Sequence, residues 1–348
     1  MPGDVTLDVS QVADSLALVN AIADAGPARC AATVVGYGRM GQAYVAALEA
    51  LRAGPIRVCV RTERAQDALR ARPQLEAVTG GFERLASARN EREIGIVAVP
   101  IESLAPAAAH LAACGFRRLL IEKPVALSSG EIERLADRMD AAGSEAFCAF
   151  NRIAYPSLQE LRGRIAREGG ATSCVYTMTE RVQADWTQRF SRSTLQRWGV
   201  ANSLHVLSMA HAAIGMPLSW QAHRAGSLDW HPAGSVFVGS GLTERGVPFA
   251  YHADWESTGR WSVEVHTRLA SYRLCPMERL AVRHVVPGEW EEVPLAVASR
   301  EIKAGLLEQV AALAHPSVRA LAPLMTLRET ARLVRFAESV FGYEERQG

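Results

Sequence analysis

The spacing of apolar residues divides the chain into two halves. In the first half, short apolar runs alternate with longer stretches in which apolar residues recur every three or four positions. The runs predict buried strands and the stretches predict amphipathic helices. Strands are expected at residues 30–35, 56–60, 94–99, 119–122 and 146–150, and helices at 8–25, 42–53, 64–71, 104–114 and 129–142. This alternation indicates a doubly wound α/β domain, in which helices cover both faces of a parallel sheet.

Residues beyond 150 follow a different pattern. Helices are predicted at 157–168, 200–214, 302–314 and 327–341, and strands at 172–179, 236–239, 249–255, 261–267, 271–274 and 280–286. Because no helices separate the later strands, we expect a mostly antiparallel open sheet in an α+β domain. The sequence therefore predicts two domains, residues 1–150 with an N-terminal helical extension and residues 151–348, with the functional site in the crevice between them.

A glycine-rich turn follows the first predicted strand and opens a helix. It reads Gly36-Tyr37-Gly38-Arg39-Met40-Gly41, which has the spacing G-x-G-x-x-G. The glycines permit a tight turn, a close approach of pyrophosphate and close helix–strand packing, and the helix N-terminus favours an anion. We therefore expect a Rossmann domain whose six turn residues contact a dinucleotide. The alternative is a purely structural glycine turn.

The residues after the second predicted strand bear on which dinucleotide is bound. Asp or Glu usually stands there when the ribose 2′-hydroxyl of NAD is recognised, but this chain has Arg61-Thr62-Glu63-Arg64. An arginine can pair with a 2′-phosphate through forked, charge-assisted hydrogen bonds. We expect Arg61, Thr62 and Arg64 to contact NADP, and Glu63 keeps NAD open.

Composition and charge argue against several other classes of protein. The formal net charge of +1 over 348 residues argues against a nucleic-acid surface or a polybasic membrane surface. No apolar run reaches the roughly 18 residues of a membrane span, and the first 28 residues do not resemble a signal peptide. The six cysteines are scattered without a C-x-x-C pair, which favours reduced thiols, no metal site and a cytoplasmic protein.

Further motifs resemble those of the Gfo/Idh/MocA family (glucose-fructose oxidoreductase, inositol dehydrogenase and rhizopine catabolism proteins). Besides the glycine turn, the matching segments are Ile96-Val97-Ala98-Val99-Pro100, Glu122-Lys123-Pro124, Phe150-Asn151-Arg152, Tyr155-Pro156-Ser157, Ile302-Lys303-Ala304-Gly305 and Arg328-Glu329-Thr330-Ala331. The resemblance spans residues 30–343. It implies an NAD(P)-dependent oxidoreductase of a sugar, nucleotide sugar or polyol, assembled as a homodimer or homotetramer. It also implies that Val99, Pro100, Glu122 and Lys123 contact the cofactor, and that Asn151, Arg152 and Tyr155 contact the substrate.

Lys123 is the predicted general acid/base. In a partly desolvated cleft beside an oxidised nicotinamide, its ammonium would meet a like charge. Both effects lower the pKa of a lysine and make the neutral amine available as a base. Pro124 biases Lys123 towards an extended backbone, which helps to hold the amine in place. A surface lysine is the alternative interpretation.

The second domain departs from the family pattern at one position. Many members carry an Asp four residues before a His, and here His205 matches the histidine while residue 201 is Ala. Asn202 lies near the same helical face and can bind a hydroxyl, but it cannot act as a base. We expect His205 to assist Lys123 and to contact substrate together with Asn202 and Trp198. A structural role for His205 is the alternative.

An Arg/Trp-rich segment at residues 180–198 is the predicted specificity loop. It carries Arg181, Asp185, Trp186, Arg189, Arg192, Arg197 and Trp198. Guanidinium groups among aromatic rings suit anionic or sugar-phosphate groups, and a charged surface loop is the alternative. Trp255, Trp261 and Tyr272, on β-rich runs, are assigned to sheet packing or to an oligomer interface.

Two functions compete with hydride transfer. One is a glycoside hydrolase or lyase that uses bound NAD transiently, because some relatives of this family cleave glycosides. The other is a non-catalytic dinucleotide-sensing regulator, which the missing carboxylate at Ala201 keeps open. The presence of Lys123 argues against the regulator.

Overall fold

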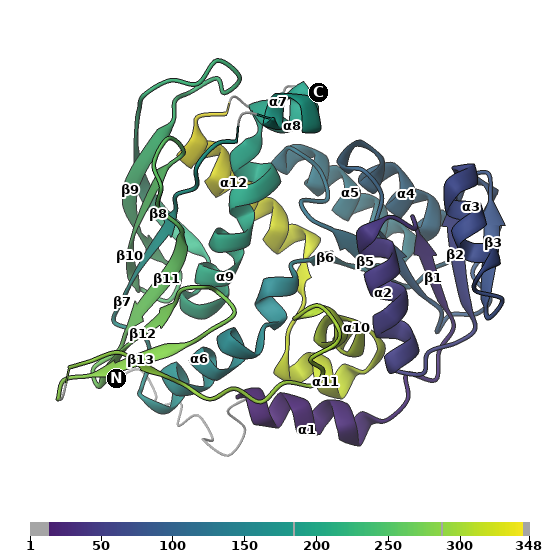
Figure 1. The fold of residues 1–348 in the computed structure, drawn as a ribbon, viewed down its shortest axis with the longest axis horizontal. Helices are drawn as coiled ribbons and strands as arrows, with labels where there is room; N and C mark the ends of the chain where they lie inside the picture. Colours follow the sequence, from purple (N-terminus) through teal and green to yellow (C-terminus); the bar gives the residue numbers. More distant parts are fainter. Residues whose placement is uncertain (1–13, 184, 287, 344–348) are drawn as a thin grey trace.

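Two sheets lie side by side, with helices around and between them (Figure 1). The structure is a computed structural model that describes residues 14–183, 185–286 and 288–343, apart from the side chains of Glu63 and Arg64. Helix α1 (Ser15–Ala25) begins after Asp14, whose side chain accepts a hydrogen bond from the Ala17 amide. The part of the predicted first helix that precedes Asp14 lies outside the described residues.

The first sheet is the predicted parallel one. It has seven strands in the order β15-β6-β5-β4-β1-β2-β3. Its strands are β1 (Ala32–Val35), β2 (Ile56–Val60), β3 (Leu75–Thr79), β4 (Ile94–Val97), β5 (Arg118–Glu122), β6 (Glu145–Ala149) and β15 (Met325–Thr326). β1 to β6 pair in parallel, and β15 is antiparallel to β6 at the edge. The strand order reverses between β1 and β4, which opens a crevice at the carboxyl ends of these strands.

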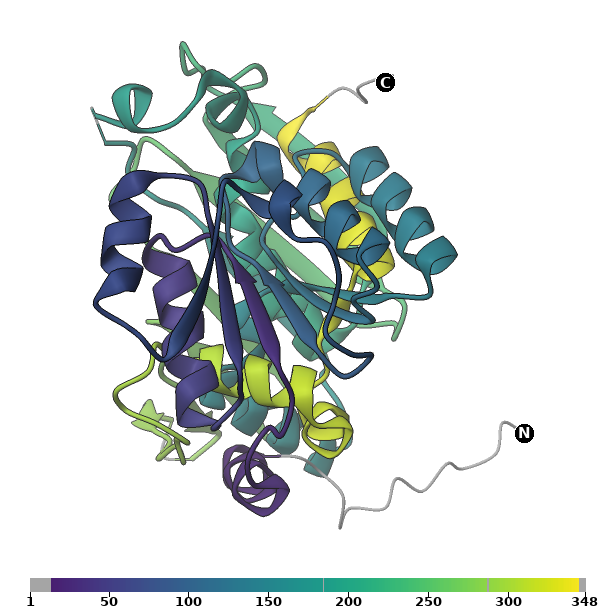
Figure 2. The same ribbon diagram turned by 90° about the vertical axis from the view of Figure 1, so that its right-hand side faces the viewer.

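Helices lie on both faces of this sheet (Figure 2), and each face packs its own hydrophobic core. Val35, Val97 and Ile121 pack with α4 (Ile101–Ala113) and α5 (Ser129–Ala142). Their neighbours along the strands, such as Val34 and Ile96, pack with α2 (Arg39–Ala50) and α10 (Leu306–Ala314). Alternate residues therefore serve opposite cores, which explains why these strands are apolar throughout. The short helix α3 (Glu63–Arg70) connects β2 to β3.

The second sheet is mostly antiparallel, as predicted, and has eight strands in the order β14-β13-β12-β11-β7-β10-β9-β8. They are β7 (Ser173–Met178), β8 (Pro217–Ala225), β9 (Val236–Thr243), β10 (Pro248–Asp254), β11 (Trp261–His266), β12 (Ala270–Leu274), β13 (Ala281–His284) and β14 (Glu291–Glu292). β7 and β10 are the parallel pair. Buried and less buried residues alternate along β7, β10 and β12, so one face of the sheet is covered and the other is open. The covering helices are α6 (Pro156–Arg167), α9 (Leu204–Ile214) and α12 (Leu327–Phe341).

Helix α12 joins the two sheets. Its N-cap Thr326 and Glu329 form a capping box, which satisfies free amides at the helix start. Near its other end, the buried Glu338 accepts hydrogen bonds from Ser129 Oγ (2.6 Å) and from Arg197 Nη1 (3.0 Å). One carboxylate thereby links α12 to α5 and to the chain just before α9.

The predicted helix at 302–314 was wrong at its start. Helix α10 begins at Leu306, after Gly305 with a φ of +79°. A Cβ at Gly305 would lie 2.0 Å from the Asn151 carbonyl oxygen, so the chain turns tightly there. Ile302 and Lys303 consequently lie in a loop.

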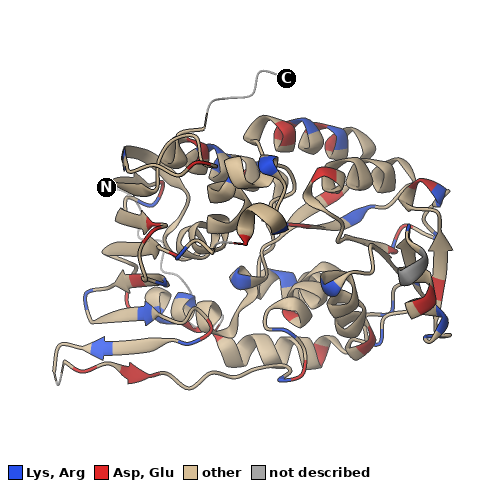
Figure 3. Cartoon of the chain, turned by 45° about the horizontal axis from the view of Figure 1, so that its top comes forward, with Lys and Arg blue, Asp and Glu red and all other residues tan. Residues whose placement is uncertain are grey.

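Charged residues of both signs are spread over the described chain. Lys and Arg are interspersed with Asp and Glu over both halves (Figure 3). Among the helices that the structure describes, none has the length and apolar character needed to cross a membrane.

Candidate active site

The glycine turn has the close packing that its spacing predicts. Gly36 follows β1 with a φ of +97°, and a Cβ there would lie 2.3 Å from the Ala98 carbonyl oxygen. A Cβ at Gly41 would lie 2.0 Å from the Gly36 carbonyl oxygen. Gly38, the N-cap of α2, faces open space. Two glycines therefore permit close packing, and the third leaves the helix N-terminus open to a ligand.

A cleft of about 880 Å³ lies over this turn and at the ends of the neighbouring strands. It is lined by predicted cofactor residues, namely Gly36, Tyr37, Gly38, Arg39, Met40, Arg61, Thr62, Val99, Pro100, Glu122 and Lys123. Gly41 lies behind the turn, against Gly36. The Arg64 side chain lies outside the described residues. The volume and the open helix N-terminus fit a dinucleotide.

Part of the cleft wall was not predicted. Gly81, Phe82 and Glu83, which follow β3, line it beside Arg61. β3 was not predicted, because only Leu75 of this edge strand is buried. Glu76 interrupts its apolar residues, so it lacks the continuous apolar run by which the other strands were predicted.

Lys123 stands at the carboxyl end of β5 and reaches the second domain. Its Nζ donates a hydrogen bond of 2.7 Å to the Ala201 carbonyl oxygen. Burial lowers the pKa of Lys123 to about 8, since the charged form loses solvation. The charge of Glu122 acts in the opposite direction, and those of Arg152 and Lys303 lower the pKa further.

Glu122 is fixed from the first domain. Its Oε1 accepts a hydrogen bond of 2.6 Å from the hydroxyl of Tyr44, a buried residue of α2. Burial raises the pKa of the Glu122 carboxyl, while the Tyr44 hydrogen bond and the charge of Lys123 lower it.

His205 begins the regular part of a helix that opens with a π-helical turn, η4 (Gly199–Ser203). Burial and the charges of Lys123 and Arg152 hold the pKa of His205 well below its ordinary value. The imidazole is therefore neutral at pH 7. Its Nδ1 is buried and has no hydrogen-bond partner among the described residues. The neighbouring Ala201 contributes its carbonyl to Lys123, and no side-chain charge.

A half-buried carboxylate that was not predicted from the sequence, Glu180, holds Asn202. Glu180, after β7, accepts hydrogen bonds from Asn202 Nδ2 (3.0 and 3.1 Å) and from Trp198 Nε1 (2.8 Å). Burial raises the pKa of Glu180, and both hydrogen bonds and the charge of Lys123 lower it. In the sequence, Glu180 stood out only as the first residue of the predicted specificity loop.

The predicted substrate residues Asn151, Arg152 and Tyr155 lie in and beside η3 (Asn151–Ala154). Asn151 Nδ2 donates to the Ala304 carbonyl oxygen (3.1 Å), and the Tyr155 hydroxyl donates to Glu278 Oε1 (3.3 Å). The bond to Ala304 holds the loop that carries Lys303, whose Nζ is 3.5 Å from Met40 Sδ in the glycine turn. Lys303, noted in sequence only as part of a helix motif, therefore belongs to the site.

Comparison with known proteins agrees with this geometry. Residues 30–150 match the family model described as "Oxidoreductase family, NAD-binding Rossmann fold" (GFO_IDH_MocA). The match covers about a third of the chain, and over these residues it supports the resemblance to the Gfo/Idh/MocA oxidoreductases, with an NAD-binding Rossmann fold. No curated protein matches the chain.

Solved structures share the fold of this chain over 90% of its length. The dehydrogenase GnnA of Acidithiobacillus ferrooxidans, which acts on UDP-N-acetylglucosamine, is 15% identical with a TM-score of 0.69 (90% of this chain, 97% of the other). Levoglucosan dehydrogenase in complex with NADH is 16% identical with a TM-score of 0.71 (90% and 96%). An NAD-binding oxidoreductase from Klebsiella pneumoniae is 15% identical with a TM-score of 0.71 (90% and 96%).

Much of the predicted specificity loop supports the fold. Arg197 pairs with the buried Glu338 at 3.0 Å, and Arg189 pairs with Asp185 at 3.4 Å on the surface. The rings of Trp186 and Trp198 pack with their centres 4.3 Å apart.

The three aromatic residues assigned to sheet packing differ in their surroundings. Trp255 and Tyr272 are fully buried. Trp261 is only half-buried, and its ring lies near His205 and Arg152.

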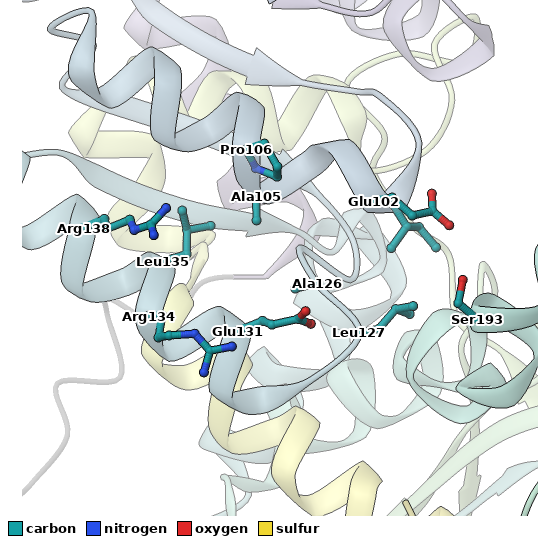
Figure 4. A pocket seen from close by; sticks show the side chains of 11 residues that line it. Glu102, Ala105, Pro106, Ala126, Leu127, Glu131, Arg134, Leu135, Arg138 and Ser193 are labelled. Atoms are coloured by element: carbon teal, nitrogen blue, oxygen red, sulfur yellow. The ribbon is translucent and has the colours of Figure 1, made fainter. Parts of the chain in front are cut away.

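A second hollow, of about 450 Å³, lies between α4 and α5 (Figure 4). It is lined by Glu102, Glu131, Arg134 and Arg138, with Ser193 at one end. None of the predicted catalytic residues borders it. The cofactor cleft is therefore the candidate active site.

Proposed function

We propose that this oxidoreductase transfers a hydride between NADP and a carbinol or ketone carbon of a sugar, nucleotide sugar or polyol, with Lys123 as general acid/base. The observation that carries the proposal is the position of Lys123. Its amine lines the same cleft as the glycine turn, at the end of β5, with a pKa of about 8. A bound nicotinamide accepts or supplies the hydride.

Lys123 moves the accompanying proton. In the oxidative direction its neutral amine accepts the proton of the substrate hydroxyl, and in the reductive direction its ammonium protonates the carbonyl oxygen. A pKa near the working pH suits a group that must do both. The Ala201 carbonyl holds the amine in position in either state.

Asn202 supports the substrate hydroxyl in place of the carboxylate that is missing at residue 201. A carboxylate only accepts hydrogen bonds, so Glu180 requires Asn202 to present its Nδ2. The Asn202 Oδ1 then remains as an acceptor for the substrate, beside the neutral His205.

Arg61 supports NADP as the cofactor. It is exposed on the wall of the cleft and forms no ion pair with the described residues, so its guanidinium is available to a 2′-phosphate. Thr62 caps α3 beside it by accepting a hydrogen bond from the Ala65 amide. Glu83 on the same wall favours NAD, which is the second candidate.

The substrate class is supported by two structural neighbours. GnnA is named for UDP-N-acetylglucosamine, and levoglucosan dehydrogenase for an anhydrosugar. The six free cysteines support the cytoplasm as the compartment.

The open face of the second sheet supports a homodimer or homotetramer. Val175, Val238 and Leu242 point outward from β7 and β9 with exposed fractions of 49%, 37% and 46%. Pairing with a second copy would bury this apolar surface.

A side-by-side fluorescence titration with NADPH and NADH tests the cofactor assignment, followed by a screen of sugars for a change in nicotinamide absorbance. Tighter binding of NADPH together with turnover of a sugar is expected. Turnover of a glycoside without a net absorbance change would instead favour a hydrolase or lyase. Binding of neither dinucleotide would refute the oxidoreductase.

A further inference from the structure

Three buried polar atoms gather around Trp261 without a hydrogen-bond partner in the described part of the chain. They are Nε of Arg152, Nδ1 of His205 and Nε1 of Trp261 itself. The guanidinium carbon of Arg152 lies 5.2 Å from the centre of the Trp261 ring, and the His205 and Trp261 ring centres are 5.9 Å apart. Buried polar atoms are nearly always satisfied in native proteins, so such a group indicates a place for a ligand or water.

The three atoms come from separate elements that converge. Arg152 lies in η3, His205 in α9 and Trp261 at the start of β11. The guanidinium of Arg152 also lies 5.9 Å from the Tyr155 ring centre, so two aromatic rings fix its position. The position of Arg152 Nε is therefore fixed, although this atom donates no hydrogen bond within the described residues.

Three cationic side chains surround this group of atoms without a direct ion pair. Lys123, Arg152 and Lys303 form no ion pair within the described residues; Lys123 Nζ donates to a carbonyl and Lys303 Nζ contacts a sulfur. The nearby carboxylates keep their charge, but they accept hydrogen bonds from neutral donors and form no ion pair with these cations, Glu122 bonding to Tyr44 and Glu180 to Asn202 and Trp198. The charges of Arg152 and Lys303 both lower the pKa of His205, which reports the same positive potential.

The chemistry of these atoms selects the ligand group. The N–H groups of Arg152 Nε and Trp261 Nε1 can only donate hydrogen bonds. A carboxylate or a phosphate offers acceptors alone and carries the compensating charge, whereas a sugar hydroxyl carries none.

We propose that the substrate is an anionic sugar whose carboxylate or phosphate binds at the edge of the stacked Arg152 and Trp261, beside His205. This inference rests on the proposed function, since it places the anion next to the reacting carbon at Lys123. The site is distinct from the predicted specificity loop, whose Arg197 and Arg189 pair with carboxylates of the fold.

The test measures binding rather than turnover. Protein saturated with reduced dinucleotide is titrated with D-glucuronate, D-glucose 6-phosphate and D-glucose, and the dissociation constants are measured by calorimetry. At least one anionic sugar is expected to bind about tenfold or more tightly than glucose. The tighter of the two anions assigns the group as carboxylate or phosphate.

Substitutions identify the residue responsible. Arg152→Gln should remove the preference for the anion, and Arg152→Lys should retain part of it. Arg138→Gln, which removes an exposed arginine on α5, is the matched control and should change nothing. Dinucleotide affinity and the melting temperature of each variant verify the fold.

The inference is overturned if glucose binds as tightly as both anions, if no sugar binds, or if Arg152→Gln keeps the preference. Failure of the proposed function is a separate outcome, because it appears as loss of dinucleotide binding before any sugar is added.

Discussion

At the scale of single residues, burial accounts for the chemistry available at Lys123. A lysine at the end of a buried strand loses solvation, and here the charges of Arg152 and Lys303 act with burial to favour the neutral amine. The Glu122 charge opposes them, which keeps the pKa near 8. A residue with this balance exists in both protonation states close to physiological pH.

Replacing Lys123 by Ala should reduce kcat by about 10²-fold or more, the usual scale of general acid–base catalysis. Dinucleotide affinity should stay nearly the same, because the glycine turn and Arg61 are untouched. Steady-state kinetics and a fluorescence titration measure the two quantities. Unchanged turnover would exclude the proposed role.

The pH dependence follows from the lowered pKa of Lys123. Oxidation needs the neutral amine, so kcat/KM should rise with pH and level off above about 8. Reduction needs the ammonium, so kcat/KM should fall as pH rises through about 8. Profiles in both directions check the sign. In Lys123→Arg the side chain stays protonated. Any residual activity of this variant should therefore lack the change in kcat/KM near pH 8.

Arg61→Asp should reverse the cofactor preference. A carboxylate at this position repels a 2′-phosphate, so NADPH binding should weaken by at least about tenfold more than NADH binding. Parallel titrations of the two dinucleotides measure the difference. Equal losses would mean that another residue recognises the 2′-phosphate.

At the scale of secondary-structure elements, strand and helix ends assemble the site. The carboxyl ends of β1, β2, β4 and β5 all border the cofactor cleft, as expected where the strand order of a parallel sheet reverses. The predicted strand 56–60 and helices 129–142 and 327–341 have the bounds of β2, α5 and α12. β3 and β8 were missed, because edge strands with mostly exposed residues lack a clear apolar period.

Glu180 connects β7 to the start of α9, and its substitution tests that connection. Glu180→Gln is expected to lower kcat/KM by about tenfold, because a neutral partner no longer dictates which way the Asn202 amide points. Glu180→Asp should retain more activity, and dinucleotide affinity should not change. The pH profile of kcat/KM discriminates a positioning role from a structural one. Loss of the Glu180 charge should also shift the pH at which kcat/KM changes through titration of Lys123.

At the scale of the whole molecule, α12 couples the two sheets and so fixes the distance across the cleft. Its Glu338 is only 5% exposed and binds Arg197 and Ser129. Catalytic groups from the two domains meet only while this packing is kept. Lys123 and Ala201 are the clearest example, being 78 residues apart in sequence.

Glu338→Gln should therefore destabilise the protein by about 3 kcal/mol, because it removes the negative charge of a buried ion pair. Chemical denaturation measures the loss. Glu133→Gln, which breaks the exposed pair with Arg335, serves as a control and should change stability by less than about 1 kcal/mol. Similar losses for both variants would contradict the role given to Glu338.

The sequence alone determined the features that depend on local chemistry. The α/β class, most helices and strands, the glycine turn and Lys123 follow from residue period, turn glycines and short motifs, which neighbouring residues encode together. The tertiary structure decided which residues far apart in the sequence contact one another in the site. That Ala201 binds Lys123 through its backbone, that Glu180 holds Asn202, and that Trp261 lies beside Arg152 and His205 depends on packing between distant elements. No local period records such a contact, because its free energy arises only when both elements are folded together.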